Sequence, residues 1–351
     1  MSIFKKIEKS LTEKHCFVCY RKPNSKIISS LFQNSDTRYL DKNLNSTGFI
    51  FAPFEDKNDA IIIPLENSTY YEDFFSNNAV TISEKINLKN TSDRAFHINL
   101  VKKGISAINN NQFKKVVLSR KETIELKNEV NVVELFQNLL STYMNAFVYL
   151  WFHPKVGLWL GATPETLVKI HNRCFETMAL AGTLPYVKNS IPNWTPKEIE
   201  EQQFVTDYII ENLSPLCKSL TSGKIETIKA GTLLHLKTKI EGELLVSNSK
   251  LIKTLHPTPA VCGLPMKPSK QFILKNENYD RTFYTGFLGE LNMNNRTELF
   301  VNLRCMEIKN SQAFIYVGGG ITKDSISDKE WEETTKKATI MQHMITKKSL
   351  R

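Results

Sequence analysis

Short apolar runs, some alternating with polar residues and some continuous, recur along the whole chain and predict many strands. The predicted strands span residues 15–20, 47–52, 60–64, 113–120, 146–152, 158–165, 167–171, 175–181, 225–230, 233–240, 281–291, 297–308 and 313–317. Apolar residues at helical spacing predict helices at 1–14, 91–109 and 131–142. Because strands and helices do not alternate regularly, the pattern favours an α+β fold with large, mainly antiparallel sheets.

A further helix begins near residue 195 with a clear capping signal. Thr195 is followed by Pro196 at the first helical position and by Glu198, which completes a capping box. Its apolar stripe is formed by Val205, Tyr208, Ile209 and Leu213. Glu201 precedes the first two of these by four and seven residues, so its carboxylate projects from the same face.

The last predicted helix follows residues 313–317, which run into three consecutive glycines, Gly318 to Gly320. Neither the GxGxxG nor the GxxxxGK[ST] pattern is present, so the glycines do not match a nucleotide-binding loop. Ser327 and Glu330 match a second capping box. One helix face then carries Glu330, Glu333 and Lys337, and Ile340, Met341 and Met344 continue it as an apolar stripe.

The composition is that of a globular protein, with 41% hydrophobic and 23% charged residues in a chain of 351. A chain of this length can form one large domain or two modest ones, and no segment marks a clear linker between two domains. No apolar run reaches 18 residues and the N-terminus lacks the apolar segment of a secretory signal. We therefore expect a cytoplasmic protein without a membrane partner.

The formal charge of +10 does not by itself indicate a nucleic-acid partner. The lysines are scattered, and no basic run is interleaved with aromatic residues that could stack on bases. A basic surface can instead steer a small anionic substrate into a cleft. We therefore expect no nucleic-acid partner.

Six cysteines are present, and only Cys16 and Cys19 form a CxxC pair. No second pair completes a zinc site, and the alternation around this pair is typical of a strand. We therefore expect structural thiols in a reducing compartment.

Several charged residues interrupt apolar patterns where a protein core is expected. Lys115 opens a buried-looking strand, Glu165 ends another behind a proline, and Arg304 interrupts a third. Each of these alone is typical of a paired structural charge. Together with the carboxylates and the lysine on the two capped helices, they describe a site for an anionic substrate held through a divalent metal.

Nine collinear motifs across residues 95–345 resemble the chorismate-utilising enzymes and, within that family, the isochorismate synthases. They are KVVLSR (115–120), LGATPETL (160–167), ALAGTLP (179–185), KEIEEQQFVTDYI (197–209), HLKT (235–238), LHPTPAVCGLP (255–265), GFLGEL (286–291), NLRC (302–305) and YVGGGI with EWEET (316–334). Residues 1–94 carry no motif, and we expect them to contribute strands to the sheets of the catalytic region at 95–345.

The resemblance implies a chorismate-binding fold, in which two α/β subdomains pack large sheets around a central active-site cleft with helices outside. It also implies a Mg²⁺-dependent isomerisation of chorismate to isochorismate. Water adds at C2 of the ring while the C4 hydroxyl leaves. Family precedent favours a monomer.

The resemblance also assigns roles to individual residues. Lys115 matches the general base, which can act only when its neutral amine is populated, and Glu165 matches the general acid. The metal ligands are Glu201 and Glu333, with Glu330 supporting the ion through a bound water. The substrate-binding residues implied are Thr183, His235, Ala260, Arg304, Gly318 and Lys337.

Two differences from other members of the family narrow the expected activity. Aminating members do not need the lysine base, and the common aminodeoxychorismate synthases place a nucleophilic lysine where this chain has Ala181. The main alternative is a salicylate synthase, which forms isochorismate and then eliminates pyruvate. A non-catalytic, basic nucleic-acid-binding protein is the other alternative.

The chain departs from the family pattern beside Glu201. Members of the family often have a histidine next to this glutamate, whereas here Gln202 and Gln203 follow it. Glutamine keeps hydrogen bonding but not basicity, so we expect Glu201 to remain a ligand and the groups around it to tune the site differently. The product isochorismate feeds menaquinone, catecholate siderophore or salicylate biosynthesis.

Overall fold

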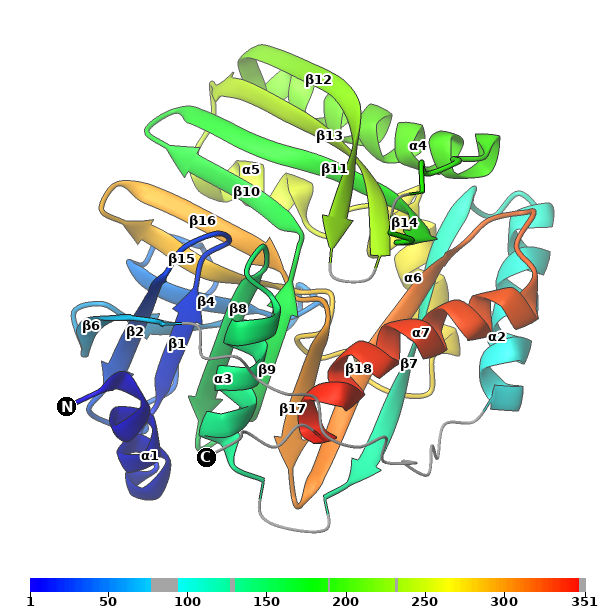
Figure 1. The fold of residues 1–351 in the computed structure, drawn as a ribbon. Coiled ribbons are helices and arrows are strands. Elements are labelled where there is room, and N and C mark those ends of the chain that lie inside the picture. The colour runs from blue at the N-terminus through cyan, green and yellow to red at the C-terminus, as the bar shows by residue number, and fades with distance from the viewer. Residues whose placement is uncertain (77–93, 127–129, 189, 231–232, 347–351) are drawn as a thin grey trace.

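The computed structural model describes residues 1–76, 94–126, 130–188, 190–230 and 233–346, and these form two nine-stranded sheets (Figure 1). Neighbouring strands are antiparallel throughout the described pairings. This architecture confirms the predicted α+β class with large antiparallel sheets. The side chain of Ile340 lies outside the described ones.

Sheet A contains strands from both the N-terminal and the C-terminal parts of the chain. Its order is β14 (Gly263–Leu264), β7 (Lys115–Glu125), β18 (Gln312–Ile321), β17 (Cys305–Lys309), β9 (Gly157–Thr163), β8 (Phe147–His153), β1 (Phe17–Arg21), β2 (Ile27–Gln33) and β6 (Ser68–Phe74). The predicted strand at 313–317 was too short. The glycines continue it, because Gly318 to Gly320 pair with residues 117–119 of β7.

Sheet B is built mainly from the middle of the chain. Its order is β12 (Cys217–Ala230), β13 (Leu233–Leu244), β11 (Cys174–Pro185), β10 (Thr166–His171), β16 (Arg296–Val301), β15 (Phe287–Met293), β4 (Gly48–Ala52), β5 (Ala60–Pro64) and β3 (Tyr39–Asp41). Strands that precede residue 77 therefore join both sheets. The boundary drawn between residues 94 and 95 stays a prediction.

The sheets pack face to face through an aromatic core, and helices cover their outer faces. Phe147 of sheet A stacks on Phe300 of sheet B with ring centroids 4.2 Å apart. The helices are α1 (Ile3–Glu13), α2 (Arg94–Asn109), α3 (Val132–Thr142), α4 (Pro196–Leu213), α5 (Asn248–Leu255), α6 (Met266–Asn276) and α7 (Ser327–Thr346). Figure 1 shows α7 lying across β18 and β7.

Helices α4 and α7, for which the sequence predicts capping boxes, pack with their apolar faces against the two sheets. On α4, Val205, Ile209 and Leu213 are buried against sheet B. Glu198 accepts a hydrogen bond from the Thr195 N–H at 2.9 Å, as the capping box predicts. On α7, Met341 and Met344 are buried against sheet A.

Two further sequence predictions need correction. Helix α7 already includes Ser327, so the cap position assigned to that residue is wrong by one. The strand predicted over 297–308 is two strands, β16 and β17, which belong to different sheets. The chain passes between the sheets at residues 302–304.

All six cysteines are free thiols, and Cys16, Cys19, Cys262 and Cys305 are buried. Cys174 is exposed and Cys217 is half-buried. Cys19 lies in β1 and Cys16 directly precedes the strand, close to the strand that the alternation predicts. Within the described ranges, no helix combines the length and apolar character needed to cross a bilayer.

Candidate active site

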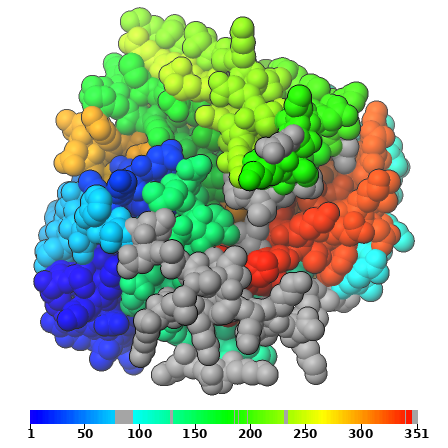
Figure 2. Space-filling model, in the orientation of Figure 1, coloured from blue at the N-terminus to red at the C-terminus, as the bar shows by residue number. Residues whose placement is uncertain are grey.

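A cavity of about 150 Å³ lies where sheet A, sheet B, α4 and α7 meet. It is lined by every residue proposed above for the site: Lys115, Glu165, Thr183, Glu201, His235, Ala260, Arg304, Gly318, Glu330, Glu333 and Lys337. Figure 2 shows the surface above this region, where green atoms from the middle of the chain meet the red atoms of α7. Residues more than 200 positions apart in sequence are thus brought together.

The cavity forms where the paired strands β17 and β18 separate. They pair only over residues 306–309 and 312–315, and β18 then continues alongside β7 alone. Before β17 the chain turns sharply at Arg304, whose φ of 48° lies in the left-handed region that few residues other than glycine adopt. The open edge of β18 therefore faces Leu303 and Arg304 across the cavity.

Lys115 and Glu201 form an ion pair on the cavity wall. The Lys115 Nζ lies 2.8 Å from Glu201 Oε1, and only 1% of the lysine side chain is exposed. β7 supplies the lysine and α4 the glutamate. The inward position predicted for each residue from its local pattern is therefore correct.

Glu165 is enclosed at the end of β9, with 5% of its surface exposed. Burial raises the pKa of Glu165 to about 7, although the charges of Lys115 and Arg304 lower it. The loss of hydration has the larger effect on the pKa of Glu165, because the carboxylate gains no ion pair of comparable strength. A carboxyl group in this state holds a proton near neutral pH.

Arg304 and His235 contact each other on the opposite wall. An Arg304 Nη2 lies 3.1 Å from His235 Nε2, and His235 Nδ1 lies 2.8 Å from the carbonyl oxygen of Gly182. Thr183 Oγ1 is 3.4 Å from the same Nδ1. Burial lowers the pKa of Arg304 to about 10, so its guanidinium stays charged near neutral pH.

Helix α7 directs three charged side chains into the cavity from one face. Lys337 Nζ lies 2.8 Å from Glu333 Oε1 and donates to the carbonyl oxygen of Gly318 at 3.0 Å. Glu330 is buried on the same face, one turn earlier. The N–H and C=O of one strand residue point the same way, so the Gly318 N–H also faces the open edge of β18.

The glycines of β18 make room for the carboxylates. A Cβ on Gly320 would lie 2.8 Å from Glu201 Oε1, and one on Gly319 would lie 3.5 Å from Glu330 Oε2 and 3.6 Å from Glu333 Oε1. Carboxylate oxygens are the donors that Mg²⁺ prefers, so this glycine cradle fits such an ion. Among the described residues, however, no three His, Cys, Asp or Glu side chains are already gathered around one metal position.

Comparison with known proteins identifies the family of this chain. A family model described as chorismate binding enzyme matches residues 54–346. The chain belongs to this family. The family predicted from the motifs is therefore confirmed, and the match begins well before residue 95.

Relatives of this chorismate-binding enzyme include named isochorismate synthases. The vibriobactin-specific isochorismate synthase of Vibrio cholerae is 30% identical over 232 residues, 63% of this chain and 59% of that protein. Isochorismate synthase DhbC of Bacillus subtilis is 30% identical over 262 residues, 69% of this chain and 66% of that protein. The chain thus spans less than two thirds of the length of these relatives.

Solved structures share the fold of this chorismate-binding enzyme. A putative 2,3-dihydroxybenzoate-specific isochorismate synthase, DhbC from Bacillus anthracis, superposes with a TM-score of 0.82 at 23% identity, covering 99% of this chain and 100% of that one. MenF, the menaquinone-specific isochorismate synthase from Escherichia coli, gives 0.77 at 19% identity, covering 94% and 88%. The predicted chorismate-binding fold is therefore confirmed.

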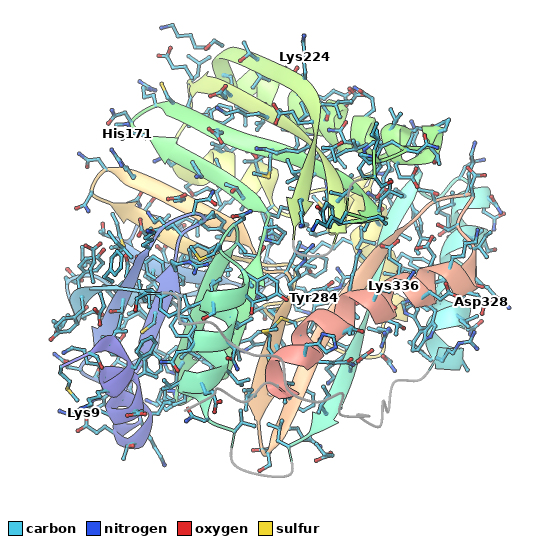
Figure 3. All side chains as sticks on the ribbon, viewed as in Figure 1. Lys9, His171, Lys224, Tyr284, Asp328 and Lys336 are labelled. Atoms are coloured by element: carbon cyan, nitrogen blue, oxygen red, sulfur yellow. The ribbon has the colours of Figure 1, made fainter. Side chains whose placement is uncertain are left out.

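The sequence patterns did not single out Tyr284, which lines the cavity of this chorismate-binding enzyme. It was placed inside a strand predicted over 281–291, but β15 begins only at Phe287. Left-handed φ values at Thr282 and Thr285 turn the chain there. Figure 3 shows Tyr284 near the centre of the molecule, and its hydroxyl lies 3.0 Å from the position of a Cβ on Gly318.

The two glutamines that depart from the family pattern both lie away from the cavity that Glu201 lines. Gln202 is buried and donates to Thr206 and Thr238 at 3.0 and 2.7 Å. Gln203 is exposed and donates to Asp207. Neither lines the cavity, so the departure leaves the described lining unchanged.

Proposed function

We propose that this protein is an isomerase that converts chorismate to isochorismate. One observation carries the proposal: Lys115 and Glu165, found from separate motifs, are both buried in the wall of the same cavity. A base and an acid on one small cavity are what hydroxyl exchange on a ring requires. The names of several relatives agree with this activity.

In the proposed reaction one water is consumed and one is released. Lys115, as the neutral amine, takes a proton from the water that attacks C2 of the ring. The ring double bonds shift, the bond from C4 to its hydroxyl breaks, and Glu165 gives its proton to the departing hydroxyl. The raised pKa of Glu165, caused by burial, keeps that proton available near neutral pH.

The substrate's carboxylates would be held by the cations on the other side of the cavity. Arg304 and Lys337 supply charge, and the Gly318 N–H supplies a backbone donor at the open edge of β18. His235 orients Arg304 through its Nε2. Thr183 and Ala260 shape the remaining wall.

We further propose that Glu201 and Glu333 bind Mg²⁺, with Glu330 acting through a bound water. When bound, the ion would hold the ring carboxylate of chorismate and offset its charge. The donor set and the glycine cradle support this assignment. Isochorismate formed by this protein would feed menaquinone or siderophore biosynthesis. The cytoplasmic location and the monomeric state of the protein stay predictions.

The test is product analysis with purified protein, chorismate and MgCl₂. We expect isochorismate by chromatography, and loss of its formation when EDTA removes the metal. Salicylate and pyruvate as the products would instead identify a salicylate synthase. No turnover, together with a salt-dependent gel shift, would favour the nucleic-acid-binding alternative.

A further inference from the structure

Each of the two carboxylates assigned to the metal already binds a lysine. Lys115 Nζ lies 2.8 Å from Glu201 Oε1, and Lys337 Nζ lies 2.8 Å from Glu333 Oε1. The two lysines come from different elements, β7 and α7, and reach the cavity from different directions. An ammonium group is thus in contact with each of these ligand oxygens.

A divalent cation and an ammonium group compete for such an oxygen. Mg²⁺ binds carboxylate oxygen at about 2.0–2.1 Å, and a lysine in contact with the same oxygen would place two positive centres only a few Å apart. Their repulsion is large in a partly buried site, where water screens charges poorly. Metal binding through either Oε1 therefore requires the lysine to move off that oxygen.

The two lysines are not equally easy to displace. The Lys115 side chain is 1% exposed and that of Glu201 is 18% exposed, whereas Lys337 and Glu333 are 23% and 36% exposed. Lys337 also keeps a second partner, the carbonyl oxygen of Gly318 at 3.0 Å. Displacing Lys115 is therefore the more demanding step.

We propose that Lys115 and Lys337 are internal competitors of the divalent cation, neutralising Glu201 and Glu333 when no metal is bound and moving away when it binds. This rests on the proposed function, which assigns the glutamates to the metal. It gives the two lysines a role in setting metal affinity, separate from any contact with substrate. Metal binding would also free Lys115 for the attacking water and Lys337 for a substrate carboxylate.

The test measures metal binding without substrate. Mn²⁺ replaces Mg²⁺ as the probe, and free Mn²⁺ is followed by electron paramagnetic resonance. Lys115→Met keeps the apolar length of the side chain but removes the competitor. We expect it to bind Mn²⁺ about tenfold more tightly than wild type, the equivalent of about 1.4 kcal/mol. Lys337→Met, whose lysine is more exposed, should tighten binding by a smaller factor and supplies a second variant if Lys115→Met folds poorly.

Matched controls separate competition from a general loss of positive charge. Lys114 and Lys336 are exposed neighbours of the two lysines in sequence, and Figure 3 labels Lys336 on α7. Lys114→Met and Lys336→Met remove the same charge without touching Glu201 or Glu333, and we expect wild-type affinity. In a Glu201→Gln background, Lys115→Met should give no tightening.

Two results with the variants would overturn the inference. One is equal or weaker Mn²⁺ binding by Lys115→Met and Lys337→Met, with thermal unfolding confirming that both are folded. The other is equal tightening by the control variants. Neither result affects isochorismate formation by the wild type, which tests the proposed function separately. A wild type that forms isochorismate but binds no Mn²⁺ would overturn the metal assignment and this inference together.

Discussion

The contact between Arg304 and His235 fixes the protonation of the histidine ring. A guanidinium group can only donate hydrogen bonds, so His235 Nε2, 3.1 Å away, accepts. The proton is therefore on Nδ1, which donates to the carbonyl oxygen of Gly182 at 2.8 Å. Burial, followed by the charge of Arg304, lowers the pKa of His235 to about 3. His235 is a neutral support for Arg304 rather than an acid or base.

Removing the general base or the general acid should nearly abolish turnover. We expect Lys115→Ala and Glu165→Gln each to lower kcat by about 100-fold or more, because each removes a positioned proton-transfer group. Isochorismate formation is followed by chromatography. The control Lys114→Ala changes an exposed neighbour and should keep wild-type rates. A folded Lys115→Ala variant with normal kcat would refute the assigned role.

The activity should depend on the protonation of Glu165. Its pKa, raised by burial to about 7, means that the acid form is lost as the pH rises through that value. We therefore expect kcat/KM to fall on the alkaline side of about pH 7, with this limb absent from the residual activity of Glu165→Gln. A profile of kcat/KM that stays flat from pH 6 to 9 in the wild type would contradict this assignment.

The same raised pKa affects stability with a defined sign. Between the ordinary value of 4.5 and about 7, the folded protein holds a proton on Glu165 that the unfolded chain has released. The contribution of Glu165 to stability is therefore complete below pH 4.5 and is lost as the pH rises through about 7. Urea unfolding at several pH values should show a smaller loss across this range in Glu165→Gln than in the wild type.

Removing a proposed metal ligand should abolish metal-dependent substrate binding. Glu333→Ala takes away one of the two carboxylates that lie near Gly319, the other being that of Glu330. Calorimetry with chorismate, with and without Mg²⁺, should show no difference for this variant and a clear difference for the wild type. Glu332→Ala, an exposed neighbour on α7, is the control and should behave as wild type.

A side chain at Gly320 should impair the site more than it impairs the fold. A Cβ there would lie 2.8 Å from Glu201 Oε1 and 3.0 Å from Lys115 Cε. Because both atoms belong to flexible side chains, Gly320→Ala should displace them while β18 stays paired. We expect a thermal midpoint close to wild type and a kcat/KM lowered by about tenfold or more, roughly 1.4 kcal/mol of transition-state stabilisation. Normal kcat/KM in this variant would show that the glycine is not needed.

A buried cluster on the other face of β7 should control the stability of α7. The Arg120 guanidinium pairs with Glu122, donates to Thr334 Oγ1 at 2.9 Å and lies 4.1 Å from the ring centroid of Trp331. Arg120→Ala leaves Glu122 buried without this partner, so we expect a loss of about 3–5 kcal/mol in urea unfolding. The double variant Arg120→Met with Glu122→Met should lose clearly less. Equal losses would argue against the ion pair as the cause.

The local patterns identified the candidate residues but not their partners. Lys115, Glu165 and Arg304 each stand out because a charge interrupts an apolar run, which one sequence is enough to show. The stripe on α4 likewise gives the inward direction of Glu201. Tyr284 was missed because no local signal marks where β15 begins, and the turn at Thr282 and Thr285 depends on packing between the sheets.

By itself the sequence determined the class of fold, the buried faces of α4 and α7, and the motifs that indicate the family. These depend on periodicity and residue type, which act over a few positions. The tertiary structure alone decided that β17 and β18 part, that Arg304 turns into the gap, and that Lys115 meets Glu201 across 86 positions. Such contacts follow from strand order and sheet packing, and those are set by the whole chain.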